Sequence, residues 1–375
     1  MGPIQMVDLK RQYAKIKEEV DGAIHEVLNS TAFINGKAVT EFANALSGYL
    51  GIKHVIPCAN GTDALQIAMM ALDLQPGDEV ITPSFTYIAT TEVVALLHLK
   101  PVFVEVDPKT FCMDPKALEK AITSKTRAII PVHLYGQSAP MEEIMQIAEK
   151  FKIHVIEDNA QAIGSDYLFS SGIRKKTGTI GTMGTTSFFP SKNLGCYGDG
   201  GAIFTNDDTL ASKLKMIANH GQSKRYYHDI VGCNSRLDSI QAAILNVKLK
   251  NLDTYIEARR NVADYYDQAF GGQSKITTPF RAPYSHHVFH QYTLLLDGIN
   301  RNELNDFLGA KNIPSMIYYP VPAHRQQMFA SFGSAKQSLP VTDWLTERVI
   351  SLPMHTELEE EQLQYISSAV LEFSK

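Results

Sequence analysis

The feature that most constrains the fold is an alternation of short apolar runs with helix-patterned segments between residues 55 and 158. The apolar runs are rich in Val and Ile, which is typical of strands that are buried on both faces. The segments between them, such as 115–122 and 141–151, have apolar residues at helical spacing. This alternation predicts an α/β domain with a largely parallel sheet, in which ligands bind beyond the carboxyl ends of the strands.

The same patterns predict the individual elements. Strands are expected over residues 55–58, 79–82, 101–106, 127–132, 154–158 and 202–205, and helices over 8–30, 39–50, 61–72, 115–122, 141–151 and 207–218, with another beginning within 84–91. A polar loop at 220–228 precedes a long helix that starts at 234 and extends past 260. Strands at 292–296 and 315–319 and helices at 302–308 and 360–373 then indicate a small α+β unit. We therefore expect a large α/β domain, residues 1–250, and a small C-terminal domain, residues 251–375.

Composition excludes several classes of function. A net charge of -5 provides no positive field that would attract nucleic acid or an anionic membrane. The four cysteines form no CxxC or Cys/His cluster, so neither a disulfide framework nor a metal site is expected. The first twenty residues carry charges throughout, and no apolar run reaches ~18 residues. We therefore expect a cytoplasmic protein without a signal peptide or a membrane span.

One lysine has an unusual context. Lys192 follows Ser187 by five positions and precedes four glycines, the last of which is Gly201. A packed turn would desolvate its ammonium group and lower the amine pKa towards neutrality, which imine chemistry requires. The alternative is an ordinary surface lysine beside a glycine-rich loop, and these residues alone do not separate the two.

The segment Asn60-Gly61-Thr62 lies between an expected strand and an expected helix. Backbone N–H groups and a threonine hydroxyl at a helix N-terminus suit a phosphate group. The alternative is that Asn60 or Thr62 caps the helix, which is the commoner use of these residues.

Asp158 and Gln161 follow the expected strand at 154–158. An acid at this position often caps a following helix, and a glutamine three residues later is often its capping-box partner. The functional alternative is that the Asp158 carboxylate pairs with the cationic nitrogen of a cofactor ring.

These signals occur in one order, together with Thr86-Tyr87, Gly-Asp-Gly-Gly201 and Gly232-x-Asn-x-Arg236. In this combination the chain resembles, over nearly its whole length, the pyridoxal-phosphate-dependent sugar-nucleotide aminotransferases of the DegT/DnrJ/EryC1/StrS family. The resemblance implies fold type I, with a large α/β domain around a mainly parallel sheet and a small C-terminal α+β domain. Segments 58–66 and 187–207 are most similar to family members that aminate UDP-2-acetamido-2-deoxy-3-keto-D-glucuronic acid. Those enzymes make precursors of bacterial surface polysaccharides such as lipopolysaccharide O-antigen.

The resemblance also implies roles for individual residues. Lys192 would form the internal Schiff base with pyridoxal phosphate and move the proton during transamination. Asp158 would contact the pyridinium nitrogen, and Gln161 the hydroxyl side of the ring. The other implied cofactor-binding residues are Gly61, Thr62 and Ser187 for the phosphate, Tyr87 for stacking on the ring, and Asn234 for the phosphate of the neighbouring subunit's cofactor.

The role of Asn234 implies a homodimer whose active sites lie at the subunit interface. Arg236 can meet a substrate carboxylate or phosphate, or it can form a structural ion pair. The chain has Tyr318-Tyr319-Pro320 where the subgroup commonly has His-Tyr-Pro, and a tyrosine donates a hydrogen bond but carries no positive charge. Arg236, Tyr318 and Tyr319 are thus the expected substrate-binding residues, and the C6 group of the sugar stays open.

The implied reaction is a two-stage transamination in which L-glutamate donates the amino group and the keto group of a nucleotide sugar accepts it. A C4 or a 6-deoxy-3-keto dTDP-sugar is an alternative acceptor. A sugar dehydratase on the same scaffold typically has histidine in place of Lys192. A non-catalytic cofactor-binding protein is disfavoured because Lys192, Asp158 and the phosphate donors are all present.

Overall fold

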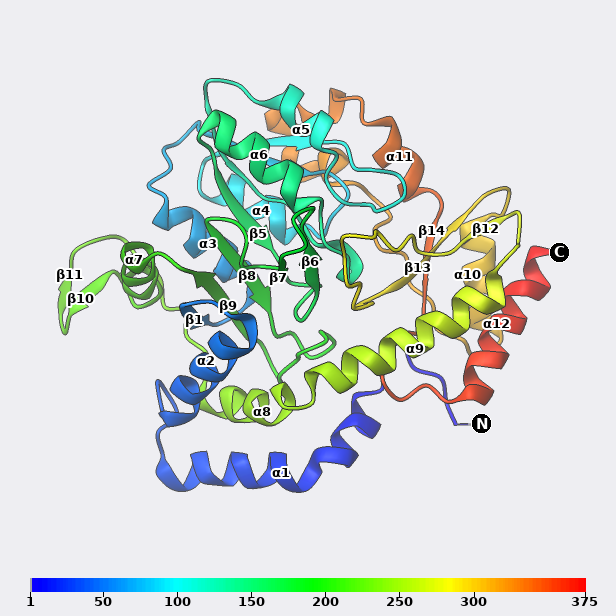
Figure 1. The fold of residues 1–375 in the computed structure, drawn as a ribbon, viewed down its shortest axis with the longest axis horizontal. Coiled ribbons are helices and arrows are strands. Elements are labelled where there is room, and N and C mark those ends of the chain that lie inside the picture. The colour runs from blue at the N-terminus through cyan, green and yellow to red at the C-terminus, as the bar shows by residue number, and fades with distance from the viewer. Residues whose placement is uncertain (1) are drawn as a thin grey trace.

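A sheet of seven strands forms the centre of the larger part of the molecule (Figure 1). The structure is a computed structural model that describes residues 2–375. The strand order across the sheet is β1-β9-β8-β5-β4-β2-β3. These strands are β1 His54–Cys58, β2 Glu79–Pro83, β3 Lys100–Val104, β4 Thr126–Ile129, β5 His154–Asp158, β8 Met183–Ser187 and β9 Gly201–Thr205.

The strand directions confirm the prediction of a mainly parallel sheet. β3, β2, β4, β5 and β8 are parallel neighbours, whereas β9 is antiparallel to both β8 and β1. The reversed strand therefore begins where β1 and β8 end, and Gly201 pairs with both Cys58 and Ser187. The sequence pattern does not predict β8, because its sequence MGTTS has small and polar residues instead of an apolar run.

Helices cover both faces of the sheet. Successive residues of a strand point to opposite faces, so Val80 and Ile81 belong to different apolar clusters. Val80 packs on the face covered by α3 Gly61–Ala71, α4 Ala89–Leu96 and α7 Asp208–Ala218. Ile81 packs on the face covered by α5 Pro115–Ala121 and α6 Met141–Phe151, and α2 Lys37–Leu50 and α8 Ser239–Leu249 cover the part of that face over β1 and β9. Most of these bounds lie within two residues of the predicted ones.

The C-terminal part has a core of its own. An antiparallel sheet of β12 Ile276–Thr277, β13 Tyr292–Leu296 and β14 Val349–Leu352 packs with α9 Leu252–Phe270, α10 Arg301–Ala310 and α12 Glu360–Ser374. The segment between α10 and β14 instead packs against the large sheet, since Phe329 contacts Phe103 of β3. It contains α11 Pro340–Thr346 and the 3-10 helices η2 Ala323–Arg325, η3 Gln327–Phe332 and η4 Ser334–Lys336. The domain boundary at 250/251 stays a prediction.

The prediction of one long helix from residue 234 is wrong. The helical region begins at Ser239 and is divided between α8 and α9, with Lys250 and Asn251 at the break. Residues 234 and 235 are extended instead, because Asn234 forms a bridge with Asn219 and the amide of Ser235 donates to the carbonyl oxygen of Ala218.

Two further local predictions are wrong. Residues 220–228 contain a hairpin of β10 Gln222–Lys224 and β11 Tyr227–His228, which projects from the body of the molecule beyond α7 (Figure 1). Residues 315–319 form no strand, and only Met316 bridges Ser351. The segment leaves the small sheet after Met316 because Tyr318 and Tyr319 bond to the large domain, as described below.

The beginning of the described chain is tied to its end. α1 Leu9–Ser30 begins at the N-cap Asp8, and Arg11 forms an ion pair of 3.0 Å with Glu359 and a hydrogen bond to the carbonyl oxygen of Glu357. Lys15 pairs with the Glu357 carboxylate at 2.5 Å. The beginning of the chain accordingly lies beside the start of α12, whereas the chain ends at the other end of that helix (Figure 1).

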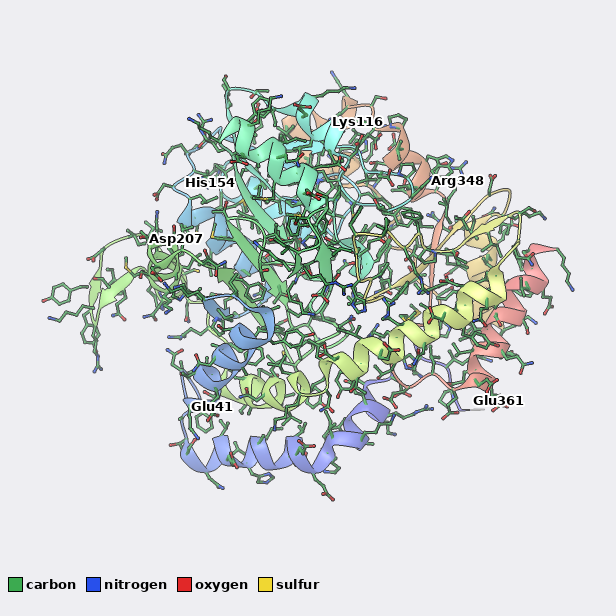
Figure 2. All side chains as sticks on the ribbon, viewed as in Figure 1. Glu41, Lys116, His154, Asp207, Arg348 and Glu361 are labelled. Atoms are coloured by element: carbon green, nitrogen blue, oxygen red, sulfur yellow. The ribbon has the colours of Figure 1, made fainter. Side chains whose placement is uncertain are left out.

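Charged side chains lie at the periphery of the fold (Figure 2). Glu41 on α2, Lys116 on α5 and Glu361 on α12 are exposed and point away from the sheet. Among the helices of residues 2–375, none is both long and apolar enough to cross a membrane.

Candidate active site

The sequence-predicted site residues gather at the carboxyl edge of the parallel strands. Ser187 ends β8, Asp158 ends β5, and Gly61 and Tyr87 lie shortly after β1 and β2. The edge therefore brings together four segments that are far apart in the sequence.

The N-terminus of α3 lies directly against the end of β8. A Cβ atom on Gly61 would lie 2.7 Å from the Cβ of Ser187, so only glycine allows this approach. Asn60 caps the helix, because its side-chain oxygen accepts from the amide of Asp63 at 2.8 Å. The amides of Gly61 and Thr62 are at the first turn, where N–H groups have no partner inside the helix. The capping alternative thus holds for Asn60 and leaves the next two amides for an anion.

Asp158 is a buried carboxylate and does not cap a helix. Its oxygens accept hydrogen bonds from the Thr90 hydroxyl at 2.8 Å and from the Ala160 amide at 3.1 Å. Thr90 in turn lies 3.1 Å from the hydroxyl of Thr86. Residues 159–164 form turns. The capping interpretation of Asp158 is therefore wrong, and its carboxylate retains acceptor capacity beyond two hydrogen bonds.

Gln161 is likewise no capping-box partner. Its side-chain oxygen accepts from the amide of Tyr135 at 2.8 Å, and its side-chain nitrogen donates to the hydroxyl of Tyr319 at 2.9 Å. The hydroxyl of Tyr135 donates to the carbonyl oxygen of Tyr318. Gln161 thereby connects the segment after β4 to the segment that carries the two neighbouring tyrosines.

Lys192 lies in the turn between β8 and β9, and its amide donates to the carbonyl oxygen of Phe189 at 2.8 Å. No side chain among residues 2–375 forms a hydrogen bond or an ion pair with its ammonium group. Desolvation by burial lowers the pKa of Lys192 to about 8, and the negative charge of Asp158 opposes this effect. Lys192 is half-buried, and its interpretation as a desolvated amine stays a prediction that the lowered pKa favours.

Aromatic rings border this edge. The Tyr87 ring is 56% exposed, and its centroid lies 6.1 Å from that of Tyr319. Tyr319 also meets the ring of buried Phe85 edge-on, and burial raises the pKa of its hydroxyl. Tyr87 thus presents an open ring face beside a neutral phenol.

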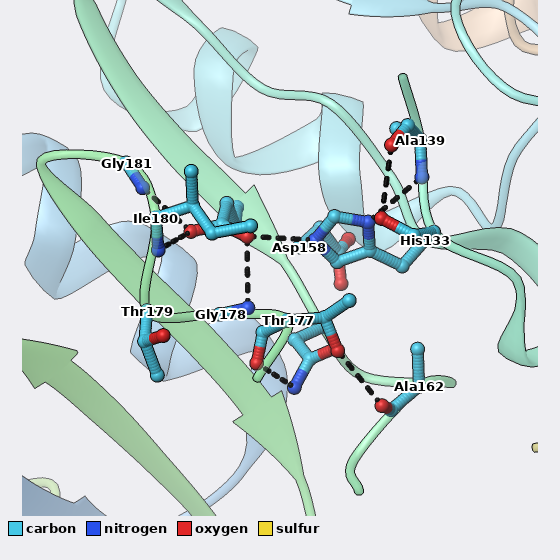
Figure 3. Close-up of polar contacts among 12 residues, drawn as sticks. His133, Ala139, Asp158, Ala162, Thr177, Gly178, Thr179, Ile180 and Gly181 are labelled. Atoms are coloured by element: carbon cyan, nitrogen blue, oxygen red, sulfur yellow. Dashed lines mark hydrogen bonds and ion pairs between the residues drawn. The ribbon is translucent and has the colours of Figure 1, made fainter. Parts of the chain in front are cut away.

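A second polar cluster lies behind Asp158 (Figure 3). The Glu157 carboxylate points to the opposite side of β5 and is fully buried, and it accepts from the amides of Gly178, Ile180 and Gly181 at 2.6–2.8 Å. Nε2 of His133 lies 2.9 Å from the same carboxylate, while Nδ1 of His133 accepts from the Ala139 amide. All hydrogen-bond partners of Glu157 are inside the protein. This cluster therefore fixes β5, and the Glu157 carboxylate has no acceptor site left for a ligand.

Two of the predicted residues lie away from these contacts. Asn234 is exposed, and within residues 2–375 Arg236 has no ion-pair partner. Their segment is held beside β1, because the hydroxyl of Ser235 accepts from the Ala59 amide at 3.0 Å. The structural ion pair considered for Arg236 is therefore not formed within the described part of this chain.

Several site residues were not found from the sequence. Thr90 and Tyr135 bond to Asp158 and Gln161 across 68 and 26 positions, and no local pattern marks such partners. His290 and Asn193 are buried with the polar atoms Nδ1 and Oδ1 unpaired, and the charge of Lys192 lowers the pKa of His290 further after desolvation. Among these four residues, only Asn193 had a signal in the sequence, which is its position directly after Lys192.

Comparisons with known proteins show the family of the chain. The model of the DegT/DnrJ/EryC1/StrS aminotransferase family matches residues 14–371. The chain is 48% identical to UDP-2-acetamido-2-deoxy-3-oxo-D-glucuronate aminotransferase of Pseudomonas aeruginosa, over 98% of this chain and 99% of that protein. It is 44% identical to UDP-N-acetyl-3-dehydro-alpha-D-glucosamine 3-aminotransferase of Acidithiobacillus ferrooxidans, over 98% and 97%.

Solved structures agree as well. A DegT DnrJ EryC1 StrS aminotransferase from Brucella abortus superposes with a TM-score of 0.94 at 41% identity and covers 99% of both chains. NtdA from Bacillus subtilis, with bound cofactor PMP, superposes with a TM-score of 0.89 at 31% identity, over 98% of this chain and 83% of that one. The α/β fold predicted from the sequence is thus confirmed.

Proposed function

Because the chain belongs to the DegT/DnrJ/EryC1/StrS aminotransferase family, we propose that it uses pyridoxal phosphate to move an amino group from L-glutamate to a UDP-linked 3-keto sugar. The preferred acceptor is UDP-2-acetamido-2-deoxy-3-keto-D-glucuronic acid, which becomes the 3-amino sugar. The observation that carries the proposal is the desolvated Lys192 amine beside the Asp158 carboxylate at the edge of the sheet.

The residues present fit this cofactor. Gly61 and Ser187 approach so closely that a Cβ would fill the space between them, and the first turn of α3 beside them has amides without a partner inside the helix. These amides, the Thr62 hydroxyl and the Ser187 hydroxyl would hold the phosphate. Asp158, with spare acceptor capacity, would hold the protonated ring nitrogen. Gln161 would bind the hydroxyl side of the ring, and Tyr87 would stack on its face.

When bound, pyridoxal phosphate supplies an electron-withdrawing ring that makes the C–H bond next to the donor's nitrogen acidic. Lys192 takes that proton on Nζ and returns it, which requires an amine that is neutral near pH 8. Thr90 and Ala160 both donate to Asp158 and so orient its carboxylate in this scheme.

The proposed assembly is a homodimer. Asn234 is exposed and follows the projecting hairpin β10–β11, on which Tyr226 and Tyr227 are 77% and 62% exposed. Large exposed aromatic side chains on a projecting element favour a protein partner. In the proposed dimer, Asn234 of one subunit reaches the phosphate site of the other.

Complementation tests the shared site. Lys192→Ala and Asn234→Lys should each be inactive alone. Mixed dimers of the two variants should regain activity, because one of their two sites then combines an intact Lys192 with an intact Asn234. Inactive mixed dimers, with exchange verified by affinity tags, would place both residues in the same subunit's site.

Arg236 and Tyr318 favour different groups at C6 of the sugar. An arginine without an intrachain ion pair can bind a C6 carboxylate bidentately, which favours the glucuronic acid. Tyr318, which carries no charge, favours the neutral hydroxymethyl group of UDP-N-acetyl-3-dehydro-glucosamine as a second candidate. The ratio of kcat/KM for these two acceptors, in wild type and in Arg236→Gln, decides between them. A preference for the uronic acid that Arg236→Gln abolishes supports the first.

The activity itself is tested in two steps. Protein loaded with pyridoxal phosphate should form 2-oxoglutarate from L-glutamate, with a change in the visible absorbance of the bound cofactor. The keto sugar nucleotide should then restore the original absorbance. A loaded protein that forms no 2-oxoglutarate contradicts the proposed donor or reaction.

The proposed product supplies lipopolysaccharide or O-antigen biosynthesis. The proposed compartment is the cytoplasm, where the thiols of Cys58, Cys112, Cys196 and Cys233 stay reduced.

A further inference from the structure

A buried serine and a buried histidine join the end of β2 to the segment that carries Tyr318 and Tyr319. Ser84 follows β2 directly, and His324 lies in the 3-10 helix η2. Neither side chain has measurable exposure. The hydroxyl oxygen of Ser84 lies 2.7 Å from Nδ1 of His324, and it also accepts from the His324 amide at 3.2 Å. The Ala323 amide donates to the carbonyl oxygen of Ser84 at 2.9 Å.

The surrounding groups assign the hydrogens of this contact. Nε2 of His324 lies 3.4 Å from the Asp343 carboxylate without forming a hydrogen bond, and this negative charge favours the imidazole proton on Nε2. Nδ1 is then an acceptor, so the Ser84 hydroxyl donates to it. The carbonyl oxygen of His324 accepts from the Ser334 hydroxyl at 3.1 Å. In the Ser84–His324 hydrogen bond, the Ser84 hydroxyl is therefore the donor and Nδ1 of His324 the acceptor.

The contact connects two sides of the candidate active site. On one side, Ser84 begins the turn that carries Thr86, whose hydroxyl contacts Thr90, the donor to Asp158. On the other side, five residues before His324, the Tyr319 hydroxyl accepts from Gln161. The aromatic side chain of Phe85 packs between them against the Tyr319 ring. A shift of η2 relative to Ser84 would thus move Tyr319 relative to Asp158.

We propose that His324 is a positioning residue: its bond to Ser84 fixes the segment 318–325 over the sheet edge, and so sets the spacing between Tyr319 and Asp158. It touches neither the cofactor nor the substrate. The inference rests on the proposed function for its kinetic effect, whereas its structural effect is independent of any substrate. Ser84, His324 and Asp343 are the residue types of a Ser-His-Asp triad, but the fully buried Ser84 meets no substrate and Asp343 faces Nε2. The group therefore has a structural role and holds two segments together.

A matched pair of variants tests this. His324→Asn places its side-chain oxygen near the Nδ1 position and keeps an acceptor for Ser84, whereas His324→Gln reaches towards the Nε2 position and loses that bond. Hydrogen exchange measured by mass spectrometry on cofactor-loaded protein reports on the amides of residues 323 and 324. Exchange in His324→Gln should be about tenfold faster at these amides, the effect of losing about one hydrogen bond, with little change in His324→Asn. KM for the sugar nucleotide should rise in His324→Gln more than kcat falls.

Ser84→Ala provides the second route if His324→Gln does not fold. It removes the hydroxyl, keeps the imidazole and should reproduce the faster local exchange. Unchanged exchange at 323 and 324 in both Ser84→Ala and His324→Gln would overturn the proposal. Faster exchange throughout the molecule would also overturn it, because His324 would then act on global stability alone. If exchange rises locally but wild type aminates no sugar nucleotide, the positioning role of His324 stands and the proposed function fails.

Discussion

Two lysines in different regions of the molecule are desolvated, and burial lowers the pKa of each to about 8. Lys192 lies at the carboxyl edge of the sheet, where the charge of Asp158 acts on it. Lys248 lies on α8, with 1% exposure, and its ammonium group is 5.2 Å from the ring centroid of Tyr197. The neighbouring titratable groups at Lys248 are the Cys196 thiol and the Arg259 guanidinium, and neither is a carboxylate. A lowered pKa therefore marks desolvation, and the convergence of strand ends, carboxylate and free amides marks the site.

Both lysines belong to the surroundings of one loop: Lys192 lies within it, and Lys248 contacts the ring of its residue Tyr197. Lys192 and Tyr197 are five residues apart, and the amide of Tyr197 donates to the side-chain oxygen of Gln241 on α8 at 2.8 Å. α8 thus holds the part of the loop at Tyr197, while the earlier part of the loop carries Lys192 at the sheet edge. Each of the following predictions separates the two lysines, in order of decreasing effect.

Lys192→Ala should lower kcat/KM at least ~10³-fold, because the proton carrier is lost. Lys248→Met is the matched control and should change kcat/KM less than ~3-fold, since methionine is similar in length and can pack against the Tyr197 ring that Lys248 contacts. Steady-state kinetics with L-glutamate, together with circular dichroism, measures both. Substantial turnover in Lys192→Ala would contradict the proposed mechanism, and a large loss in Lys248→Met would break the comparison.

Asp158→Asn should lower kcat/KM by ~10²-fold, because the ring nitrogen loses its counter-charge. The substitution should also lower the pKa of Lys192 further, since the Asp158 charge opposes the desolvation of that amine. The pH dependence of the cofactor's absorbance and its dissociation constant report on this. An unaltered pH dependence with full activity would remove Asp158 from the site.

Amine acylation of cofactor-free protein at about pH 8 should modify Lys192 at least ~10-fold faster than exposed lysines such as Lys10. Near its pKa about half of the Lys192 amine is neutral, whereas an ordinary lysine is almost fully protonated. Lys248 should stay unmodified despite a similar pKa, because it is almost completely covered. Mass spectrometry of the peptides gives all three rates, and equal labelling of Lys192 and Lys248 would mean that accessibility does not distinguish them.

Lys248→Met should flatten the pH dependence of stability. Below about pH 8 Lys248 is protonated in both states and its buried charge destabilises the fold. Between about pH 8 and about pH 10 the unfolded chain binds a proton that the folded protein has lost, so the free energy of unfolding should rise in wild type. The rise should be ~1–3 kcal/mol smaller in the variant. Urea unfolding at both pH values measures this. An identical change in the free energy of unfolding in wild type and variant would indicate that Lys248 titrates normally.

The comparison also explains how far the sequence could be read. Helices such as α6 were predicted to the residue, because their apolar spacing is local. Lys192, Asp158 and Gln161 could be singled out because glycines, strand ends and family motifs surround them in the sequence. Lys248 was not singled out, since a lysine within a helical pattern is expected to reach solvent.

The errors have a common physical cause in long-range contacts. Residues 315–319 have the composition of a strand, yet hydrogen bonds from Gln161 and Tyr135 draw Tyr318 and Tyr319 to the large domain. The partners Thr90, Ser84 and His324 became visible only when the fold brought them together. The capping interpretations of Asp158 and Gln161 failed because the turn after β5 never becomes a helix.

The pairing of Arg11 and Lys15 with Glu357 and Glu359 has a consequence for the order of folding during translation. α1 leaves the ribosome before the other described helices and strands, but the groups that hold its beginning are synthesised more than 340 residues later. The early part of the chain can build α2, α3 and the first strands while α1 waits for α8 and then for residues 357–359. Completion of the native state is therefore a late, long-range closure, which is the slow class of folding step. A nascent chain arrested before residue 239 would present α1 as an unpacked amphipathic helix, a target for chaperones, because its apolar partners on α8 would be missing.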